Sequence, residues 1–540
     1  MVDAAGSGSL ALAESSGSHA VTAIATATAA AIAAQARWDR TRTQPPRRID
    51  QHIGPSMSDP RVGSECVSQN VAGTSSDRPT VHVTGGEIRG VATDGVAAFL
   101  GIPYAAPPVG RAAFEAPAPV VPWDGVREAD GYGPTAPQVS YPEQIAAILD
   151  NVIEPGEDYL NLNVWTPDPG ASGLPVMVWI HGGAFSRGSN RIAIYAGDTF
   201  ARDGVVLVGI NYRLGAPGFG AIDGAPENRG LLDQLAALEW VQRNIAAFGG
   251  DPKQVTIFGE SAGAMSVACL LSSPRAEGLF RRAIMQSGGG GTAADPADAR
   301  RVTARIAEIA GVTADVDGLA GLSAQELLNA QTQAALELTL NPDPAIWGRT
   351  VVGQGMGIMG HFPVLDGDVL PERPVESIAA GAGRGIGLLA GWNADEFRFF
   401  LVPTGVAAMT TDDVARGVLQ RSGLDTADLD AQLAAGASPG DALCAALTEI
   451  AFAGPTRAIG DARPESSTHL YRFDYSSPVA DIRAGHAVEI PFVFDHLEQA
   501  AALTGPDPDQ AVADQMHAAW VRFAATGDPG WAAGTVHHFG

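Results

Sequence analysis

Two pentapeptides in this sequence could place a serine where it attacks a carbonyl carbon. GESAG (259–263) and GASPG (436–440) both follow the pattern Gly-x-Ser-x-Gly, which is typical of a nucleophilic serine on a tight turn between a strand and a helix. With 65 glycines in 540 residues, the pattern also arises by chance. The residues around Ser261 and Ser438 must therefore decide whether either serine is a nucleophile.

Ser438 lacks the surroundings that acyl transfer requires. No strand precedes it, and the next residue is Pro439. The residue after the nucleophile must offer a backbone N–H to the developing oxyanion, and proline has none. The segment GASPGD is better explained as a turn into the helix DALCAALTEI, with Pro439 and Asp441 in its first turn. We therefore expect a structural role for Ser438.

Ser261 meets the same requirements. The strand-like VTIF precedes it, and the apolar helical segment AMSVACLLSS follows. Gly259 and Gly263 leave room for a tight turn, and Ala262 offers a free N–H at a helix start, where the helix dipole favours negative charge. The alternative is an ordinary glycine-rich turn in a nucleotide-binding fold. The strand, turn and helix together favour a nucleophile at Ser261.

A nucleophilic serine needs a histidine base and an acid that orients it, in the chain order Ser, acid, His for this arrangement. Of the histidines after Ser261, His486 is the candidate base, because RAGHAVEIPFVFD places it in a glycine-flanked loop before an apolar segment. For the acid, there are two candidates in GIGLLAGWNADEF, where Asp395 and Glu396 follow the end of a predicted buried strand. The chemistry of the two carboxylates does not choose between them.

A second set of backbone amides could complete an oxyanion hole. In VMVWIHGGAF (176–185), a strand runs into His-Gly-Gly-Ala-Phe. Small residues let backbone N–H groups approach a substrate oxygen closely. The alternative is a plain Gly-Gly turn.

The elements that must position these residues alternate between strands and helices. Short strands with glycine turns are expected in PTVHVTGGEIRGVA and VAAFLGIPY, followed by buried strands at 175–183, 204–213, 254–261, 281–289, 385–392 and 467–473. LLDQLAALEWVQRNIAAF has helical spacing of its apolar residues. We predict an α/β fold in one domain over 79–540, with a mostly parallel, twisted sheet flanked by helices and helical insertions near 293–345 and 410–460.

The segment 1–78 has a different character. It is rich in Ser, Gly and Arg without apolar periodicity, so we expect a disordered, low-complexity tail. It contains neither a convincing signal peptide nor a transmembrane segment, which favours a cytoplasmic protein. Met57 lies inside this tail, and we hypothesise that translation naturally begins there.

Composition excludes several classes of function. The net charge of −26 argues against binding to nucleic acid or to an anionic membrane surface. The three cysteines form no C-x-x-C pair, so neither a zinc site nor a disulfide framework is expected, and Cys269 should pack as a small apolar residue. We expect no metal and no cofactor.

A collinear series of motifs resembles the type-B carboxylesterases of the α/β-hydrolase fold, especially the bacterial para-nitrobenzyl esterase-like branch. The resemblance covers about residues 80–530. The motifs that carry it are FLGIPYAAPPVG, EDYLNLNVWTP, NYRLGAPGF, ENRGLLDQLAALEWVQRNIAAFGGDPKQVTIFGESAGA, FPVLDGDVLP, GWNADEF, GHAVEIPFVF and WVRFAATGDP.

The resemblance implies roles for individual residues. Ser261 matches the nucleophile, His486 the base and Glu396 the acid, which decides against Asp395. Three backbone amides match the oxyanion hole, namely those of Gly183, Ala184 and Ala262, and Gly182 shapes the loop. A buried polar group of Glu260, Ser287 and Glu489 would bias the imidazolium and order water, although a plain packing network explains it equally well.

Departures from the family pattern narrow the expected substrate. The family's paired cysteines are replaced by Ala136 and Tyr159, so no disulfide is expected there. The intervening loop has no Trp and only Tyr141, which argues against choline esters. We expect a monomeric serine esterase that acts on small to medium, mainly neutral esters through a Ser-His-Glu triad. The alternatives are a carbamate or amide hydrolase with the same triad and a non-catalytic binding module of the same fold.

Overall fold

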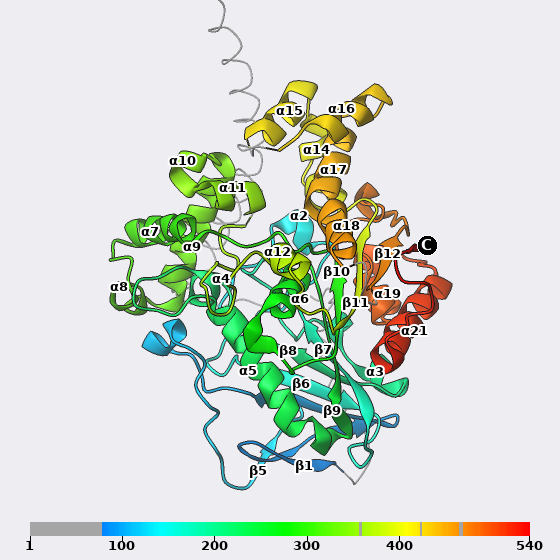
Figure 1. Cartoon of the computed structure of the whole chain (residues 1–540). Helices are drawn as coiled ribbons and strands as arrows, with labels where there is room; N and C mark the ends of the chain where they lie inside the picture. Colours follow the sequence, from blue (N-terminus) through cyan, green and yellow to red (C-terminus); the bar gives the residue numbers. More distant parts are fainter. Residues whose placement is uncertain (1–77, 356–358, 422–423, 464–467) are drawn as a thin grey trace, which may run out of the picture.

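The computed structural model describes residues 78–355, 359–421, 424–463 and 468–540. Within these residues the main sheet has ten strands in the order β13-β12-β11-β10-β9-β7-β8-β6-β4-β3, and the strands from β8 to β13 pair in parallel (Figure 1). The other edge is antiparallel, from β3 to β8 through β4 and β6. The predicted mostly parallel α/β sheet is confirmed.

Six strands lie where the apolar runs predict them: β7 (Leu174–Ile180), β8 (Val206–Ile210), β9 (Gly250–Glu260), β10 (Arg282–Gln286), β11 (Gly387–Asn393) and β12 (Thr468–Phe473). The chain also adds β13 (Val536–Phe539) beside β12, a strand that the sequence did not predict. The early strands are β3 (Val91–Thr93), β4 (Val96–Pro103) and β6 (Asn161–Thr166). A separate three-stranded sheet contains β1 (Thr80–Val83), β2 (Gly86–Arg89) and β5 (Val126–Glu128).

Alternate residues of the central strands enter two hydrophobic cores, one on each face of the sheet. In β7, Val176 and Val178 join the core that contains α5 (Arg229–Asn244) and α6 (Ala262–Ser272). Met177 and Trp179 join the core that contains α3 (Asp198–Arg202), α19 (Ile490–Val493) and α21 (Gln510–Thr526). Because both faces are buried, these strands are continuous apolar runs rather than alternating ones.

The predicted helical insertions form two groups in the upper half of Figure 1, α10 and α11 on one side and α15 and α16 on the other. The first group is α7 (Pro296–Ala310), α8 (Val316–Ala320), α9 (Ala324–Leu340), α10 (Pro344–Trp347) and α11 (Arg349–Gly355). The second is α14 (Val406–Met409), α15 (Asp412–Arg421), α16 (Ala427–Ala434), α17 (Pro439–Thr448), η5 (Glu449–Ala453) and α18 (Gly454–Asp461). Residues of α17 and η5 reach the candidate site, as described below.

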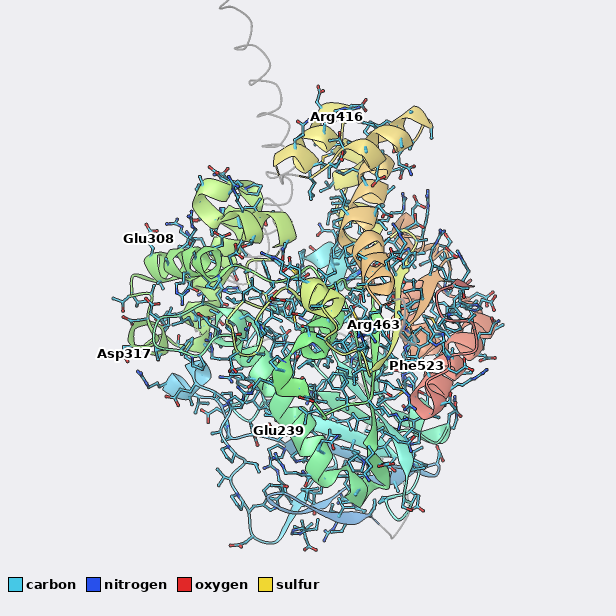
Figure 2. All side chains as sticks on the ribbon, viewed as in Figure 1. Glu239, Glu308, Asp317, Arg416, Arg463 and Phe523 are labelled. Atoms are coloured by element: carbon cyan, nitrogen blue, oxygen red, sulfur yellow. The ribbon has the colours of Figure 1, made fainter. Side chains whose placement is uncertain are left out.

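The predicted tail, with Met57 and Cys66, lies outside the described residues apart from Arg78 at its end. The thiols of Cys269 and Cys444 are free and buried, as expected for Cys269. In the described part of the chain, no helix is long and apolar enough to cross a membrane. The acidic residues Glu308 and Asp317 lie at the left edge of the molecule in Figure 2, and Glu239 is exposed on α5.

Candidate active site

Ser261 lies on a strained turn between β9 and α6. Its φ and ψ are 56° and −122°, a conformation that is costly for a residue with a side chain. Its backbone N–H donates to the carbonyl of Gln286 at 2.9 Å, and its carbonyl accepts from the N–H of Met265 at 2.9 Å. Ser261 is partly exposed, whereas its neighbours on both sides are buried. The turn therefore presents the serine side chain at the end of the buried sheet.

The glycines of GESAG are required by close packing against β7. A Cβ on Gly263 would overlap the carbonyl of Ile180, and a Cβ on Gly259 would approach the same oxygen within 2.6 Å. Both distances are shorter than a non-bonded contact between carbon and oxygen, so a side chain at either position would displace the backbone. The Gly-x-Ser-x-Gly spacing is thus a steric condition for this turn.

His486 and Glu396 form a buried pair although 90 positions separate them. The Nδ1 atom of His486 lies 2.6 Å from Oε2 of Glu396, and the backbone N–H of His486 donates to the carbonyl of Glu396 at 3.2 Å. The other carboxylate oxygen of Glu396 accepts from the backbone N–H of Asn393 at 2.8 Å. These contacts fix the acid and orient the imidazole, with Nδ1 as the donor and Nε2 left to accept a proton.

The Nε2 atom of His486 lies 3.1 Å from Oε1 of Glu260, the residue before Ser261. Within the described residues, Nε2 forms no hydrogen bond. The rings of Phe400 and Phe452 lie 5.1 and 4.9 Å from the imidazole ring. The atom that could take a proton is thus held beside the nucleophile turn, between a carboxylate and two aromatic rings.

Three buried carboxylates surround this imidazole. Burial raises the pKa of Glu260 well above its usual range. Burial, together with the charge of Glu396, raises the pKa of Glu489 to about 7. Burial alone would lower the pKa of His486, but the carboxylates of Glu260 and Glu396 raise it to about 9. The site therefore favours an imidazolium, which is the form that a histidine base acquires during acyl transfer.

The loop at 182–185 lies directly against the serine turn. A Cβ on Gly182 would be 2.8 Å from Oε2 of Glu260 and 3.1 Å from Cβ of Ser261. Gly183 and Ala184 have φ angles of 110° and 55°, and within the described residues neither N–H has a hydrogen-bond partner. Two free amides beside the serine can donate to an oxygen bound there.

Of the remaining polar residues predicted for this site, Glu489 belongs to a hydrogen-bond network at its base and, within the described residues, Ser287 does not. Glu489 accepts hydrogen bonds from Asn393 Nδ2 at 2.6 Å and from Gln286 Nε2 at 3.3 Å. Ser287 is buried next to this network, and its Oγ has no hydrogen-bond partner in the described part of the chain. The backbone N–H of Asp395 donates to the carbonyl of Ala484, and among the described residues no hydrogen bond or ion pair joins its carboxylate to His486.

Sequence reasoning missed several residues that hold the acid and the base. Asn393 donates to Glu396 from its backbone and to Glu489 and the carbonyl of Gly485 from its side chain. Thr448 accepts from the N–H of Phe397 at 3.1 Å. Asn393 had a sequence signal, because it is a polar residue at the end of an apolar strand. Thr448 and Phe452 had none, because they lie in the helical insertion.

Ser438 has a structural role, as the sequence predicted, and this role is to cap a helix. Its Oγ accepts from the N–H of Asp441 at 3.2 Å and donates to the Asp441 carboxylate at 2.7 Å, at the start of α17. We expect Ser438→Ala to lower the free energy of unfolding by about 1 kcal/mol, because α17 loses its N-cap. Thermal unfolding followed by circular dichroism checks this. An unchanged or raised Tm would contradict the capping role.

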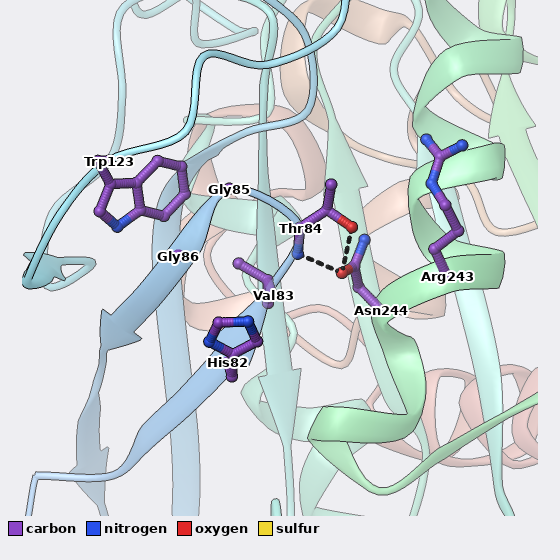
Figure 3. Close-up of a pocket in the computed structure, with 8 residues that line it drawn as sticks. All are labelled: His82, Val83, Thr84, Gly85, Gly86, Trp123, Arg243 and Asn244. Carbon is purple, nitrogen blue, oxygen red and sulfur yellow. Dashed lines mark hydrogen bonds between the residues drawn. The ribbon is translucent and has the colours of Figure 1, made fainter.

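The open depression in Figure 3 lies apart from these residues. It encloses about 520 Å³ and is lined by His82, Val83, Thr84, Gly85, Gly86, Trp123, Arg243 and Asn244. Asn244 Oδ1 accepts from the backbone N–H of Thr84 at 2.6 Å and from its hydroxyl at 3.0 Å. These contacts tie β1 to the end of α5, so the depression is explained by packing of the small sheet.

Comparisons with known proteins show the family of the chain. A family model described as "Carboxylesterase family" matches residues 77–538. The chain is 38% identical to the para-nitrobenzyl esterase of Bacillus subtilis over 82% of its own length and 89% of that protein. It is 37% identical to the phenmedipham hydrolase of Pseudarthrobacter oxydans over 84% of its length and 91% of that protein.

The fold of the chain is also similar to that of a solved structure. The crystal structure of a carboxylesterase from Geobacillus stearothermophilus at pH 6.2 superimposes with a TM-score of 0.72, at 38% identity, covering 84% of this chain and 92% of that one. The chain therefore belongs to the carboxylesterase family and is an ester-hydrolysing enzyme of the α/β-hydrolase fold.

Proposed function

We propose that the enzyme hydrolyses carboxylic esters through an acyl-enzyme formed on Ser261, with Glu396 and His486 completing a triad. The observation that carries this proposal is the strained turn of Ser261 beside a histidine whose Nδ1 is held 2.6 Å from a buried carboxylate. No metal or cofactor enters the proposal, because the serine, the base and the amides supply every step.

The acylation step transfers one proton and one acyl group. The Oγ of Ser261 attacks the ester carbonyl carbon while Nε2 of His486 takes its proton. Glu396 holds the imidazole tautomer and stabilises the imidazolium. The amides of Gly183, Ala184 and Ala262 donate to the carbonyl oxygen, which becomes negative in the tetrahedral intermediate.

The intermediate then collapses, and its C–O bond to the alcohol breaks. The imidazolium of His486 gives its proton to the leaving oxygen, so the alcohol departs neutral and the acyl group remains on Ser261. Water enters, loses its proton to the same nitrogen and attacks the acyl carbon. The bond between this carbon and Oγ of Ser261 then breaks, and the imidazolium of His486 returns the proton to Oγ. The products are a carboxylic acid and free Ser261.

Partitioning between water and methanol tests the acyl-enzyme directly. Esters with one acyl group and different alcohols are hydrolysed in dilute methanol, and the ratio of acid to methyl ester is measured. A common acyl-enzyme gives the same ratio for every leaving alcohol, because the alcohol has departed before the choice is made. A ratio that varies with the alcohol would overturn the proposal.

The finer substrate preference is a proposal as well. The net charge of −26 favours small to medium neutral esters over anionic ones at long range. A chain-length series of 4-nitrophenyl esters measures the acyl preference. The alternative activity on carbamates or amides with the same triad is tested by adding an aryl carbamate, an anilide and phenmedipham to that series, because one relative is named as a phenmedipham hydrolase.

The pH dependence of kcat/KM should reflect the charges around His486. His486 must be neutral to accept the serine proton, and its pKa is raised to about 9, so kcat/KM should rise with pH as His486 deprotonates. Glu260→Gln removes a carboxylate that stabilises the imidazolium. The pKa of His486 then falls, and we expect the rising limb to move to lower pH by about one unit.

Full pH profiles of kcat/KM for a neutral ester check this expectation. The control is Glu239→Gln, which removes a carboxylate on the exposed side of α5. A rising limb that stays in place or moves to higher pH in Glu260→Gln would contradict it.

A further inference from the structure

Arg187 carries a guanidinium that no carboxylate neutralises in the described part of the chain. Its Nε is buried without a hydrogen-bond partner, and the group lies over the ring of Tyr141, with Cζ 5.0 Å from the ring centroid. The fully buried Arg213, by contrast, is paired with Asp233 through two side-chain hydrogen bonds of 2.7 and 2.8 Å. An unpaired arginine is conspicuous in a chain with 60 acidic residues.

Arg187 belongs to the loop that carries the free amides. Its backbone N–H donates to the carbonyl of Gly183 at 3.0 Å, and only three positions separate it from Ala184. The loop is therefore a closed turn in which the amides and Arg187 have a fixed relation.

A clamp fixes the segment of Tyr141 to this loop. Gln138 donates from Nε2 to the carbonyl of Gly188 at 2.9 Å and accepts from the N–H of Gly188 at 2.8 Å. The side chain of Gln138 is buried, so this pair of hydrogen bonds is shielded from water. Tyr141 lies three residues after Gln138 and Arg187 one residue before Gly188, so the clamp holds the stacked pair together.

The stacked pair lies close to the nucleophile turn. Burial raises the pKa of Tyr141 to about 12, and the charges of Arg187 and Glu260 act on the same hydroxyl in opposite directions. Tyr141 is thus within electrostatic range of both groups, and Glu260 adjoins Ser261. A Cβ on Gly182 would lie 3.1 Å from Cβ of Ser261, and the backbone N–H of Arg187 donates to the carbonyl of the next residue, Gly183. Arg187 and Tyr141 therefore lie on the side of the site that this loop forms.

An arginine without a carboxylate partner, placed beside an active site, is suited to bind a negatively charged ligand. Burial lowers the pKa of Arg187, so its cation is poorly solvated where it stands. Arginine remains charged in proteins, and its planar fork binds a carboxylate through two parallel hydrogen bonds. Arg187 is only partly exposed, and Tyr141 covers one face of the group, which leaves the edge of the fork for a ligand.

We propose that Arg187, held over Tyr141, binds a carboxylate group of the substrate, so that the enzyme favours esters whose acyl or alcohol part carries a carboxylate that reaches it. This inference rests on the proposed function. It adds a short-range exception to the preference for neutral esters: surface charges beyond about 8 Å are screened at physiological salt, whereas a direct contact with Arg187 is not.

Two pairs of esters locate the carboxylate. For the alcohol part, 4-acetoxybenzoate is compared with the neutral 4-acetoxybenzamide; for the acyl part, mono-4-nitrophenyl adipate is compared with 4-nitrophenyl hexanoate. The quantity measured is the ratio of kcat/KM for the anionic ester to that for its neutral partner. We expect Arg187→Gln to lower this ratio by about tenfold to a hundredfold in one pair, since the substitution removes a charged hydrogen-bond donor.

Controls separate recognition from loop packing. Arg187→Lys keeps the charge but not the fork and should retain part of the ratio. Arg243→Gln removes a positive charge from an exposed site on α5 and should leave the ratio unchanged. If Arg187 only packs against Tyr141, Arg187→Gln will lower both members of each pair equally, and the inference is overturned.

Product inhibition of the wild-type enzyme needs no variant. If Arg187 binds a carboxylate of the alcohol part, 4-hydroxybenzoate should inhibit more strongly than 4-hydroxybenzamide; if it binds one of the acyl part, adipate should inhibit more strongly than hexanoate. Equal or weaker inhibition by the more highly charged product in both pairs would overturn the inference. A wild-type enzyme that hydrolyses none of the four esters, or a Ser261→Ala variant that remains active, would instead overturn the proposed function.

Discussion

Replacing Ser261 with alanine should abolish ester hydrolysis, with a loss in kcat of about a millionfold. The substitution removes only the Oγ atom that would form the acyl-enzyme. Alanine keeps the Cβ, so the turn and its hydrogen bonds to Gln286 and Met265 can persist. The measurement is the initial rate with a 4-nitrophenyl ester, compared with the buffer rate and with circular dichroism of the variant.

Ser438→Ala is the matched control for this result. It removes the same atom from the second Gly-x-Ser-x-Gly pentapeptide, where the serine caps α17. Its kcat should equal that of the wild type at temperatures below its slightly lowered Tm. Activity that survives Ser261→Ala would contradict the mechanism, and so would activity lost from a folded Ser438→Ala variant.

Replacing Glu396 with glutamine should lower kcat about ten-thousandfold. The carboxylate of Glu396 accepts from Nδ1 of His486 at 2.6 Å and from the N–H of Asn393 at 2.8 Å. A glutamine keeps the shape of the side chain but has no negative charge, and it has only one oxygen to accept from the two donors. The imidazole then loses both its preferred tautomer and the stabilisation of its cation.

The adjacent acid supplies the control for Glu396. Asp395→Asn removes a carboxylate one position away, at a residue whose backbone binds Ala484 and not the imidazole. Steady-state kinetics of both variants with one ester should show a large loss in Glu396→Gln and a small change in Asp395→Asn. The reverse order would show that the acid has been wrongly assigned.

The central strands could be predicted because burial on both faces makes them unbroken apolar runs. β13 escaped prediction for the opposite reason. It has four residues, VHHF, and pairs with β12 on one side only, so two polar side chains are tolerated at the edge of the sheet. Its position depends on tertiary pairing, which leaves no local pattern in the sequence.

The serine turn could be predicted from local features because a strand, two glycines and a helix are consecutive in the chain. The pairing of His486 with Glu396 joins residues 90 positions apart, and residue chemistry alone left Asp395 and Glu396 as equal candidates. The resemblance of the motif GWNADEF to the carboxylesterase family favoured Glu396, and the hydrogen bond between Glu396 and Nδ1 of His486 supports that assignment. The contact with the imidazole, rather than residue type, distinguishes the two acids.

The proposed role of Arg187 could not be predicted from the sequence. Its significance depends on Tyr141, which comes from a different loop, and on the absence of a carboxylate partner among the described residues. Neither property is visible from a single arginine in FSRGSN. Net charge predicted a preference for neutral esters, but charge at the site depends on which side chains fold next to one another.

Covalent labelling identifies the nucleophile of the enzyme. The enzyme is inactivated with a 4-nitrophenyl alkylphosphonate, which phosphonylates an activated serine and releases 4-nitrophenolate, and the modified peptide is identified by mass spectrometry. We expect one phosphonyl group per chain on Ser261, with activity lost in proportion to labelling. Complete inactivation with the label on Ser438 or any other residue, and none on Ser261, would contradict this expectation.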